Sequence, residues 1–233
     1  MTMPDNSEKP EVSAADVAHA VVKGAVSAVP VVGGVLSETL SLIFSPPLEK
    51  RREKWLQTLA DAIEEIKQKL ENFSPEKLSQ NEAFVTTAMH ASQIASRAHQ
   101  EEKLRALRNA IVNAALPGAP DETKQQIFLE HVDSLTPWHL RILAFFDSPE
   151  AWFERHNIRR PNITAGGQSH ILEAGIPDLR GQREFYDQII KDLEARGLMP
   201  GGGIHVMVSG HGLWQPRITN WGREFLRFIS ERA

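Results

Sequence analysis

Apolar side chains recur at helical spacing just after the first fifty residues. These positions are three or four residues apart and comprise Leu56, Leu59, Ile63, Ile66 and Leu70. Glu and Lys side chains occupy the positions between them. Because such spacing places the apolar side chains on one face, we predict an amphipathic helix over about residues 47–72 that buries this stripe.

The helical pattern continues to about residue 147. Further helices are expected over 81–98, 100–116, 121–135 and 138–146, and Asn81, Asp121 and Thr136 have the side chains that cap helix starts. Pro117-Gly118-Ala119-Pro120 predicts a loop between two of these helices. The middle of the chain is therefore expected to be almost entirely α-helical.

The last third of the chain has a different pattern. Residues 157–181 are rich in glycine and proline and predict a loop with room for one short helix. A helix is expected over 183–196, with Phe185 among its buried residues and Gly197 as a left-handed cap. Two β-prone runs, Ile204–Val208 and Leu213–Ile218, predict a β-hairpin. Thr219 or Asn220 then caps a closing helix.

The N-terminal part combines a polar tail with an apolar segment. Residues 1–12 are polar and predict a disordered tail. Residues 17–44 form two short apolar runs around a Pro-Val-Val-Gly-Gly elbow, and neither run has the ~20 apolar residues that a bilayer span needs. A basic cluster follows, and Trp55 comes directly after it.

This arrangement allows two interpretations of residues 17–44. An apolar hairpin beside basic side chains is typical of a segment at the surface of an anionic membrane, where Trp55 would also fit. Alternatively, the hairpin packs inside its own helical domain and the basic cluster is solvated. The candidate membrane or partner contacts are Val31, Val32, Leu36, Leu40, Phe44, Lys50, Arg51, Arg52 and Lys54.

Composition excludes several kinds of chemistry. The chain has 233 residues and no cysteine, so disulfides, thiolate metal sites and cysteine nucleophiles are excluded, and a reducing, cytoplasmic location fits. Binding of residues 17–44 to lipid would place the chain at the inner face of the membrane. The first 132 residues hold 14 basic and 18 acidic side chains, and the rest hold 12 of each. Neither part has the positive excess of a nucleic-acid-binding surface.

No motif indicates catalysis. Gly201-Gly202-Gly203 lacks the following Lys-Ser/Thr of a phosphate-binding loop, and no serine lies in a Gly-x-Ser-x-Gly turn. His205 and His211 would be only two metal ligands. We therefore expect no enzyme activity, no cofactor and no metal site.

Two phrases near the C-terminus are similar to winged-helix domains of bacterial regulators. The first, Leu-Glu-Ala-Arg-Gly-Leu-Met at 193–199, resembles the end of a recognition helix. The second, Ile-Thr-Asn-Trp-Gly-Arg-Glu-Phe-Leu at 218–226, resembles the Thr-x-x-Gly start of the last helix. The resemblance covers about 137–231. It implies a mainly α fold, with a helical domain over 13–134 and a winged-helix-like α+β domain with one β-hairpin over 135–233.

The resemblance also implies a contact surface on the winged-helix domain. In DNA-reading members the recognition helix enters the major groove, but here residues 183–196 carry four acidic and three basic side chains, and phosphate repels acids. Contact with a protein is therefore favoured, and a DNA-binding transcriptional regulator is the alternative. The candidate contacts are Arg183, Lys191, Arg196, Trp214 and Arg217.

The order of an apolar N-terminal element, a helical middle and a winged-helix-like end resembles bacterial proteins of the abortive-infection type. That layout implies a role in phage defence. Taken together, the sequence predicts a non-enzymatic interaction or effector protein that binds a protein partner or a second copy of itself, with a membrane surface as a further contact.

Overall fold

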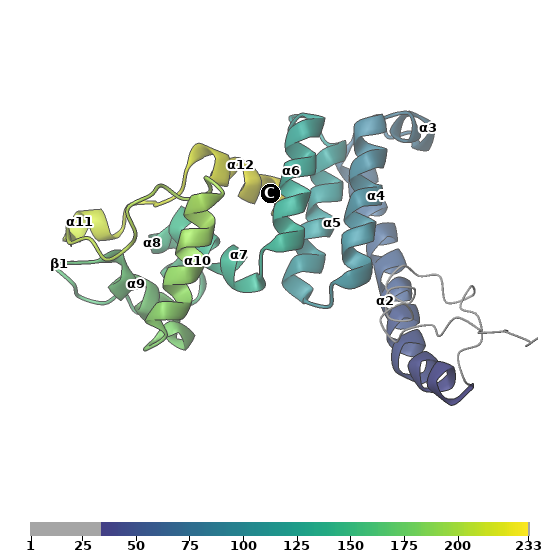
Figure 1. The fold of residues 1–233 in the computed structure, drawn as a ribbon. Helices are drawn as coiled ribbons and strands as arrows, with labels where there is room; N and C mark the ends of the chain where they lie inside the picture. Colours follow the sequence, from purple (N-terminus) through teal and green to yellow (C-terminus); the bar gives the residue numbers. More distant parts are fainter. Residues whose placement is uncertain (1–33, 233) are drawn as a thin grey trace, which may run out of the picture. The chain divides into compact units, whose positions relative to one another are not determined.

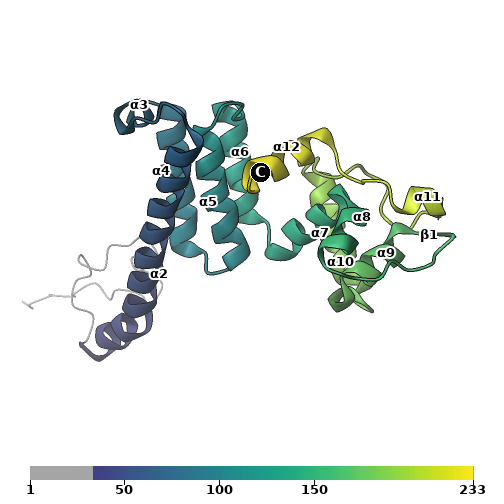
Figure 2. The same cartoon turned by 180° about the vertical axis from the view of Figure 1, so that it is seen from behind.

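The computed structural model describes residues 34–232, with side chains from Pro47 onward. Residues 1–54 and 55–233 form two compact units, and Figures 1 and 2 show the second unit from opposite sides. The described part is mainly helical, as predicted, and has one small antiparallel sheet. Its first helices are α2 (Gly34–Lys69), α3 (Pro75–Ser79), α4 (Glu82–Arg97), α5 (Glu101–Ala115), α6 (Glu122–Ser134), α7 (Pro137–Asp147) and α8 (Pro149–Arg155).

The remaining elements are shorter and alternate with loops. They are β1 (Ala165–Gly166), α9 (Gln168–Gly175), the 3-10 helix η2 (Pro177–Leu179), α10 (Arg183–Ala195), β2 (Val208–Ser209), α11 (Gly210–Leu213) and α12 (Asn220–Ile229). The domain boundary predicted near residue 134 falls in the turn between α6 and α7, inside the second compact unit.

The polar tail and the elbow of the predicted apolar hairpin lie outside the described residues, and so do Val31 and Val32. Leu36, Leu40 and Phe44 lie in α2, but their side chains are outside the described part. The sequence predicted a helix that starts at about residue 47, and that start is wrong because α2 begins at Gly34 and continues through Ser45-Pro46-Pro47. A proline removes one helical hydrogen bond and clashes with the preceding turn, but its φ angle fits a helix.

The face that α2 buries matches the predicted stripe only in part. Ile66 is buried and Leu59 and Leu70 pack against the core, whereas Leu56 is 56% exposed and Ile63 is also exposed. Trp55 and Ala62 are buried as well. The indole of Trp55 donates a hydrogen bond to the hydroxyl of Ser92 in α4 over 3.0 Å. Burial of this large side chain turns the helix, so Trp55 belongs to the helical core and the prediction of a membrane-interface position was wrong.

The predicted helix starts are confirmed by their caps. Asn81, Asp121 and Thr219 accept hydrogen bonds from backbone amides three residues later. Thr136 forms a capping box with His139 and is followed by Pro137. Gly197 ends α10 with a φ of +69°. These signals act within one helical turn, which is why the sequence alone locates them.

The last helix packs back against the middle of the chain. The ring of Phe128 in α6 has three aromatic neighbours from α12, Trp221, Phe225 and Phe228, at centroid distances of 4.6, 5.5 and 5.8 Å. Figures 1 and 2 both show α12 beside α6. The hydrophobic core therefore runs continuously from the helices before residue 134 into those after it.

A buried amide fixes the end of this helix. The side-chain nitrogen of Asn113 in α5 donates to the carbonyls of Phe228 and Ser230, each over 2.8 Å. The amide of Asn109, one helical turn earlier, donates to the carbonyl of Ile229 over 3.1 Å. The last carbonyls of a helix have no partner within the helix, so these two asparagines replace water at the buried end of α12.

The predicted hairpin between Ile204–Val208 and Leu213–Ile218 does not form. Instead β2 pairs with β1, with Ala165 opposite Ser209 and Gly166 opposite Val208. A Cβ on Gly167 would lie 2.9 Å from the carbonyl oxygen of Ile204, so glycine allows the close approach that brings these segments together. Residues 210–213 then form α11, whose carbonyls accept hydrogen bonds from the buried amide of Gln168.

We expect Asn113→Ala to lower the free energy of unfolding by about 1–3 kcal/mol, because the carbonyls at the end of α12 would stay buried without a donor. Chemical denaturation monitored by circular dichroism measures the change. Asn162→Ala, at an exposed loop position, is the matched control and should leave stability unchanged. Equal stability of the two variants would contradict the role assigned to Asn113.

His131 gives a prediction about pH. Both ring nitrogens are buried without a hydrogen-bond partner among the described residues. Burial lowers the pKa of His131, and the charge of Arg196 lowers it further, against a smaller opposing effect of Glu130. Since an unfolded histidine has a pKa of about 6.5, the unfolded state binds more protons just below that pH. The contribution of His131 is therefore complete above about pH 6.5 and is lost as the pH falls.

The test is His131→Leu, which removes the titrating group. Its free energy of unfolding should fall less between pH 7 and pH 5 than that of the wild type, by about 1 kcal/mol. At neutral pH the variant should be at least as stable, because leucine has no unpaired polar atoms. His99→Leu, at an exposed position, should keep the pH dependence of the wild type. Parallel curves for His131→Leu and the wild type would refute the assignment.

Candidate functional site

Helix α10, the candidate recognition helix, has one buried and one exposed face. Tyr186, Ile189, Ile190 and Leu193 are buried in the core. Glu184, Gln188, Lys191 and Ala195 are exposed and recur at helical spacing. We call these four residues, together with the exposed Phe185, Val206 and Met207 described below, the α10 surface. The four residues at its centre include one acid, Glu184, and one base, Lys191, so the centre has no net charge.

An aromatic pair flanks one side of the α10 surface. Phe185 is 41% exposed and meets Trp138 of α7 edge to face, with ring centroids 5.9 Å apart. The guanidinium of Arg141 lies over the ring of Trp138, 5.1 Å from its centroid, a favourable cation–π geometry. The aromatic pair is therefore held in place while much of Phe185 stays open to a partner.

The loop after α10 flanks the other side. The ring nitrogen Nε2 of His205 lies 2.6 Å from a carboxylate oxygen of Asp187. The amide of Gly203 donates to the carboxylate of Glu194 over 2.9 Å. These contacts fix the loop against α10, and the next two side chains, Val206 and Met207, are 60% and 78% exposed. Exposed apolar side chains therefore occur on α10 itself and in the loop that Gly203 and His205 hold against it.

The two phrases that resemble winged-helix domains contact each other. The carbonyl of Leu198 accepts a hydrogen bond from the amide of Thr219 over 3.1 Å, and the Thr219 hydroxyl lies 2.6 Å from the carbonyl oxygen of Gly197. A Cβ on Gly222 would lie 2.3 Å from the Leu198 carbonyl oxygen. The Thr-x-x-Gly pattern therefore caps α12 and also allows the chain after α10 to approach it.

The structure does not bring all five predicted winged-helix contacts together. Arg183 pairs with Asp187 on α10, and Lys191 and Arg196 are exposed. Arg217 donates to the carbonyl of Gly201 over 3.0 Å, so it supports the loop. Trp214 is half-buried and packs edge to face against Phe153 with centroids 5.3 Å apart.

Phe185 was predicted to be buried in α10, and the structure corrects this, because Tyr186 occupies the buried position. The signal was present in the sequence, since Tyr186 lies three and four residues before Ile189 and Ile190. Val206 and Met207 were interpreted only as strand residues, whereas in the structure they are exposed in the loop before β2.

The titratable groups behind α10 serve packing. The hydroxyl of Tyr186 donates to Glu173 over 2.8 Å, and burial, followed by this hydrogen bond, raises the pKa of Tyr186. Burial lowers the pKa of His139, and the hydrogen bond to Asp192 opposes that shift. Within residues 34–232 no three His, Cys, Asp or Glu side chains are close enough to hold a metal ion. Of the two candidate metal histidines, His205 contacts Asp187 and His211 contacts Gln215.

The basic cluster of the N-terminal part lies on α2. Lys50, Arg52 and Lys54 are exposed and Arg51 is half-buried. None of the helices in the described part of the chain is long and apolar enough to cross a membrane. No protein-family model, curated protein or solved structure matches the chain.

Proposed function

We propose that the chain is a non-enzymatic interaction protein whose α10 surface binds a protein partner. The supporting observation is the exposure of apolar side chains beside a centre without net charge, Phe185 on α10 and Val206 with Met207 in the loop held against it. Aromatic residues and methionine are enriched in the cores of protein interfaces. An exposed apolar patch of this kind is typical of a binding surface.

The order of α9, α10, β2 and α12 and the contact between the two resembling phrases support a winged-helix-like module as the frame of this surface. A DNA-binding regulator is less well supported. The charge of Arg183 is balanced by its ion pair with Asp187. The guanidinium of Arg217 donates a hydrogen bond to the carbonyl of Gly201. These two side chains are therefore poorly placed to neutralise phosphates.

The similarity of layout to abortive-infection proteins supports an effector role in phage defence. In this proposal the partner that binds the α10 surface either activates the chain during infection or is the target on which the chain acts. Residues 17–44 and the basic cluster supply a second contact, with a membrane surface.

The α10 surface is tested by a photo-crosslinking amino acid placed at Gln188 and, separately, at Met207 in cells. Both positions should yield the same discrete adduct, and Lys191→Glu should reduce it severalfold without unfolding the protein, because reversal of one central charge disturbs a matched interface. A crosslinker at Gln93, exposed on α4, is the matched control and should give no such adduct.

Two outcomes would contradict the proposal. Identical adducts from Gln188, Met207 and Gln93, or none from the first two, would mean that no partner binds the α10 surface. Binding of duplex DNA that weakens steeply with salt and is lost in Lys191→Glu would favour the regulator. Sedimentation of the purified chain decides whether the partner is a second copy.

The membrane contact is tested by flotation of the full-length chain with anionic vesicles. The chain should float with them, and the triple variant Lys50→Glu, Arg51→Glu, Arg52→Glu should bind at least about a hundredfold more weakly, since each basic side chain near an anionic surface contributes about 1 kcal/mol. Lys77→Glu, elsewhere on the exposed surface, should have little effect. Flotation that is insensitive to the triple variant and to salt would refute the contact.

A further inference from the structure

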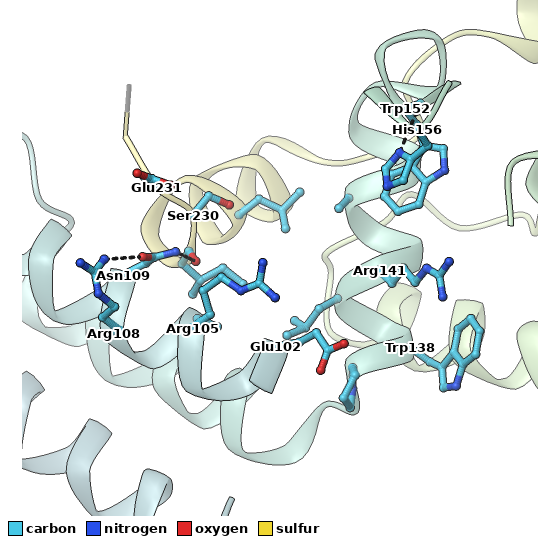
Figure 3. A pocket seen from close by; sticks show the side chains of 16 residues that line it. Glu102, Arg105, Arg108, Asn109, Trp138, Arg141, Trp152, His156, Ser230 and Glu231 are labelled. Atoms are coloured by element: carbon cyan, nitrogen blue, oxygen red, sulfur yellow. Dashed lines mark hydrogen bonds between the residues drawn. The ribbon is translucent and has the colours of Figure 1, made fainter. Parts of the chain in front are cut away.

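A large pocket opens between α5, α7, α8 and α12 (Figure 3). It has a volume of about 970 Å³. A second pocket of about 450 Å³ adjoins it and shares Ala144, Leu226 and Ser230 with it. We call the two together the arginine cleft. Sites for small molecules typically have about 300–1,000 Å³, so either pocket is large enough for a cofactor-sized ligand.

The cleft is lined by more basic than acidic side chains, in a chain whose net charge is −4. Three acidic side chains line it, Glu102, Asp147 and Glu231. Twice as many arginines do so, and they come from four helices: Arg105, Arg108, Arg141, Arg155, Arg223 and Arg227. Arginines gathered in a concave site focus positive potential and attract anions.

Several of these arginines are available to a ligand. Within residues 34–232, the side chains of Arg105 and Arg227 have no hydrogen bond or ion pair. Arg155 uses only its Nε, which donates to the carbonyl of Ala151 over 3.3 Å. By contrast, Arg108 pairs with Glu65 over 2.6 Å. Arg141 lies 3.5 Å from a carboxylate oxygen of Asp178, and Arg223 lies 3.5 Å from one of Asp147. Figure 3 shows Arg105 and Glu102 reaching from α5 into the space in front of α7.

A pair of stacked aromatic rings lines the larger pocket, which Arg105, Arg108 and Arg141 also line. The ring of His156 stacks on Trp152, with centroids 4.0 Å apart and planes inclined by 23°. The indole of Trp152 donates to the carbonyl of Gly175 over 3.0 Å, and Nδ1 of His156 lies 2.8 Å from the carbonyl oxygen of Trp152. The stack is therefore fixed, with the exposed His156 as its outer ring (Figure 3).

The end of α8 joins the two features. Trp152 and His156 line the larger pocket, and Arg155 lines the smaller one. Arg227 and Arg155 lie in the same small pocket, with the hydroxyl of Ser230 and the amide of Asn220. Guanidinium groups bind phosphoryl oxygens in bidentate fashion, and a planar base stacks on an aromatic ring. A ligand that spans both pockets would need both properties.

From this juxtaposition we infer that the arginine cleft binds a nucleoside polyphosphate, with its phosphoryl groups on Arg155 and Arg227 and its base on the His156–Trp152 stack. The inference is independent of the partner proposed for the α10 surface. A nucleic-acid strand is less suited to the cleft, because continuous binding of a strand needs a basic surface that extends beyond one pocket, and the chain as a whole is acidic.

Isothermal titration of the full-length chain with ATP tests the inference, with tripolyphosphate, adenosine and a single-stranded oligonucleotide as comparison probes. ATP should bind at one site, more tightly than either of its parts. Arg155→Ala and Arg227→Ala should each weaken ATP binding by about tenfold or more, the effect expected for a lost charge-assisted hydrogen bond. Both side chains are exposed, so circular dichroism should show a folded protein.

Two further variants distinguish a nucleotide site from general attraction of anions. His156→Ala should weaken ATP binding but not tripolyphosphate binding, because only ATP has a base to stack. Arg159→Ala, exposed and outside the cleft, is the matched control and should bind ATP as the wild type does.

The inference is overturned if ATP gives no binding heat at millimolar concentration, or if Arg159→Ala weakens binding as much as the cleft variants. If ATP and tripolyphosphate bind equally and His156→Ala affects neither, the assignment of a nucleotide ligand is overturned. The cleft would then be a site for simple polyanions. An oligonucleotide that binds more tightly than ATP and displaces it would overturn it in favour of a nucleic-acid strand.

Discussion

The capping of α12 by the buried amides of Asn113 and Asn109 is the interaction on which the second compact unit depends. A helix that ends inside a protein leaves carbonyls without donors, and leaving one unpaired costs about 1–3 kcal/mol. The two side chains meet this need from one face of α5. With its end satisfied, α12 packs Phe225 and Phe228 against Phe128. The last helix of the chain is thereby fixed to its middle.

Both functional proposals rest on that placement of α12. Its start receives the chain after α10 through Thr219 and Gly222, which holds the α10 surface in position. Its exposed side contributes Arg223 and Arg227 to the arginine cleft. Trp138 is common to both places, since it contacts Phe185 of the α10 surface and lines the larger pocket of the cleft.

Where the structure differs from what the sequence predicted, the cause is a contact between residues far apart in the chain. Leu56 and Ile63 were predicted to be buried on α2 from aliphatic spacing, but the helix buries Trp55, whose indole donates to Ser92, and leaves both exposed. The two β-prone runs after residue 203 predicted a hairpin, yet β2 pairs with β1 some forty residues earlier in the chain. Gly167 permits that pairing, and Gln168 satisfies the carbonyls of the turn that replaces the second strand. In each case a distant partner outweighs a local preference.

The sequence by itself determined the mainly helical class, the starts of α4, α6, α7 and α12 and the left-handed end of α10, because caps and amphipathic spacing act within a turn or two of helix. It also indicated α10 and its following loop as a contact surface. Only the tertiary structure decided that Phe185, Val206 and Met207 are the exposed apolar groups, and that arginines from four helices line one cleft. Those features depend on contacts between residues far apart in the chain. A buried asparagine such as Asn113 has the same letter as an exposed one, and only packing distinguishes them.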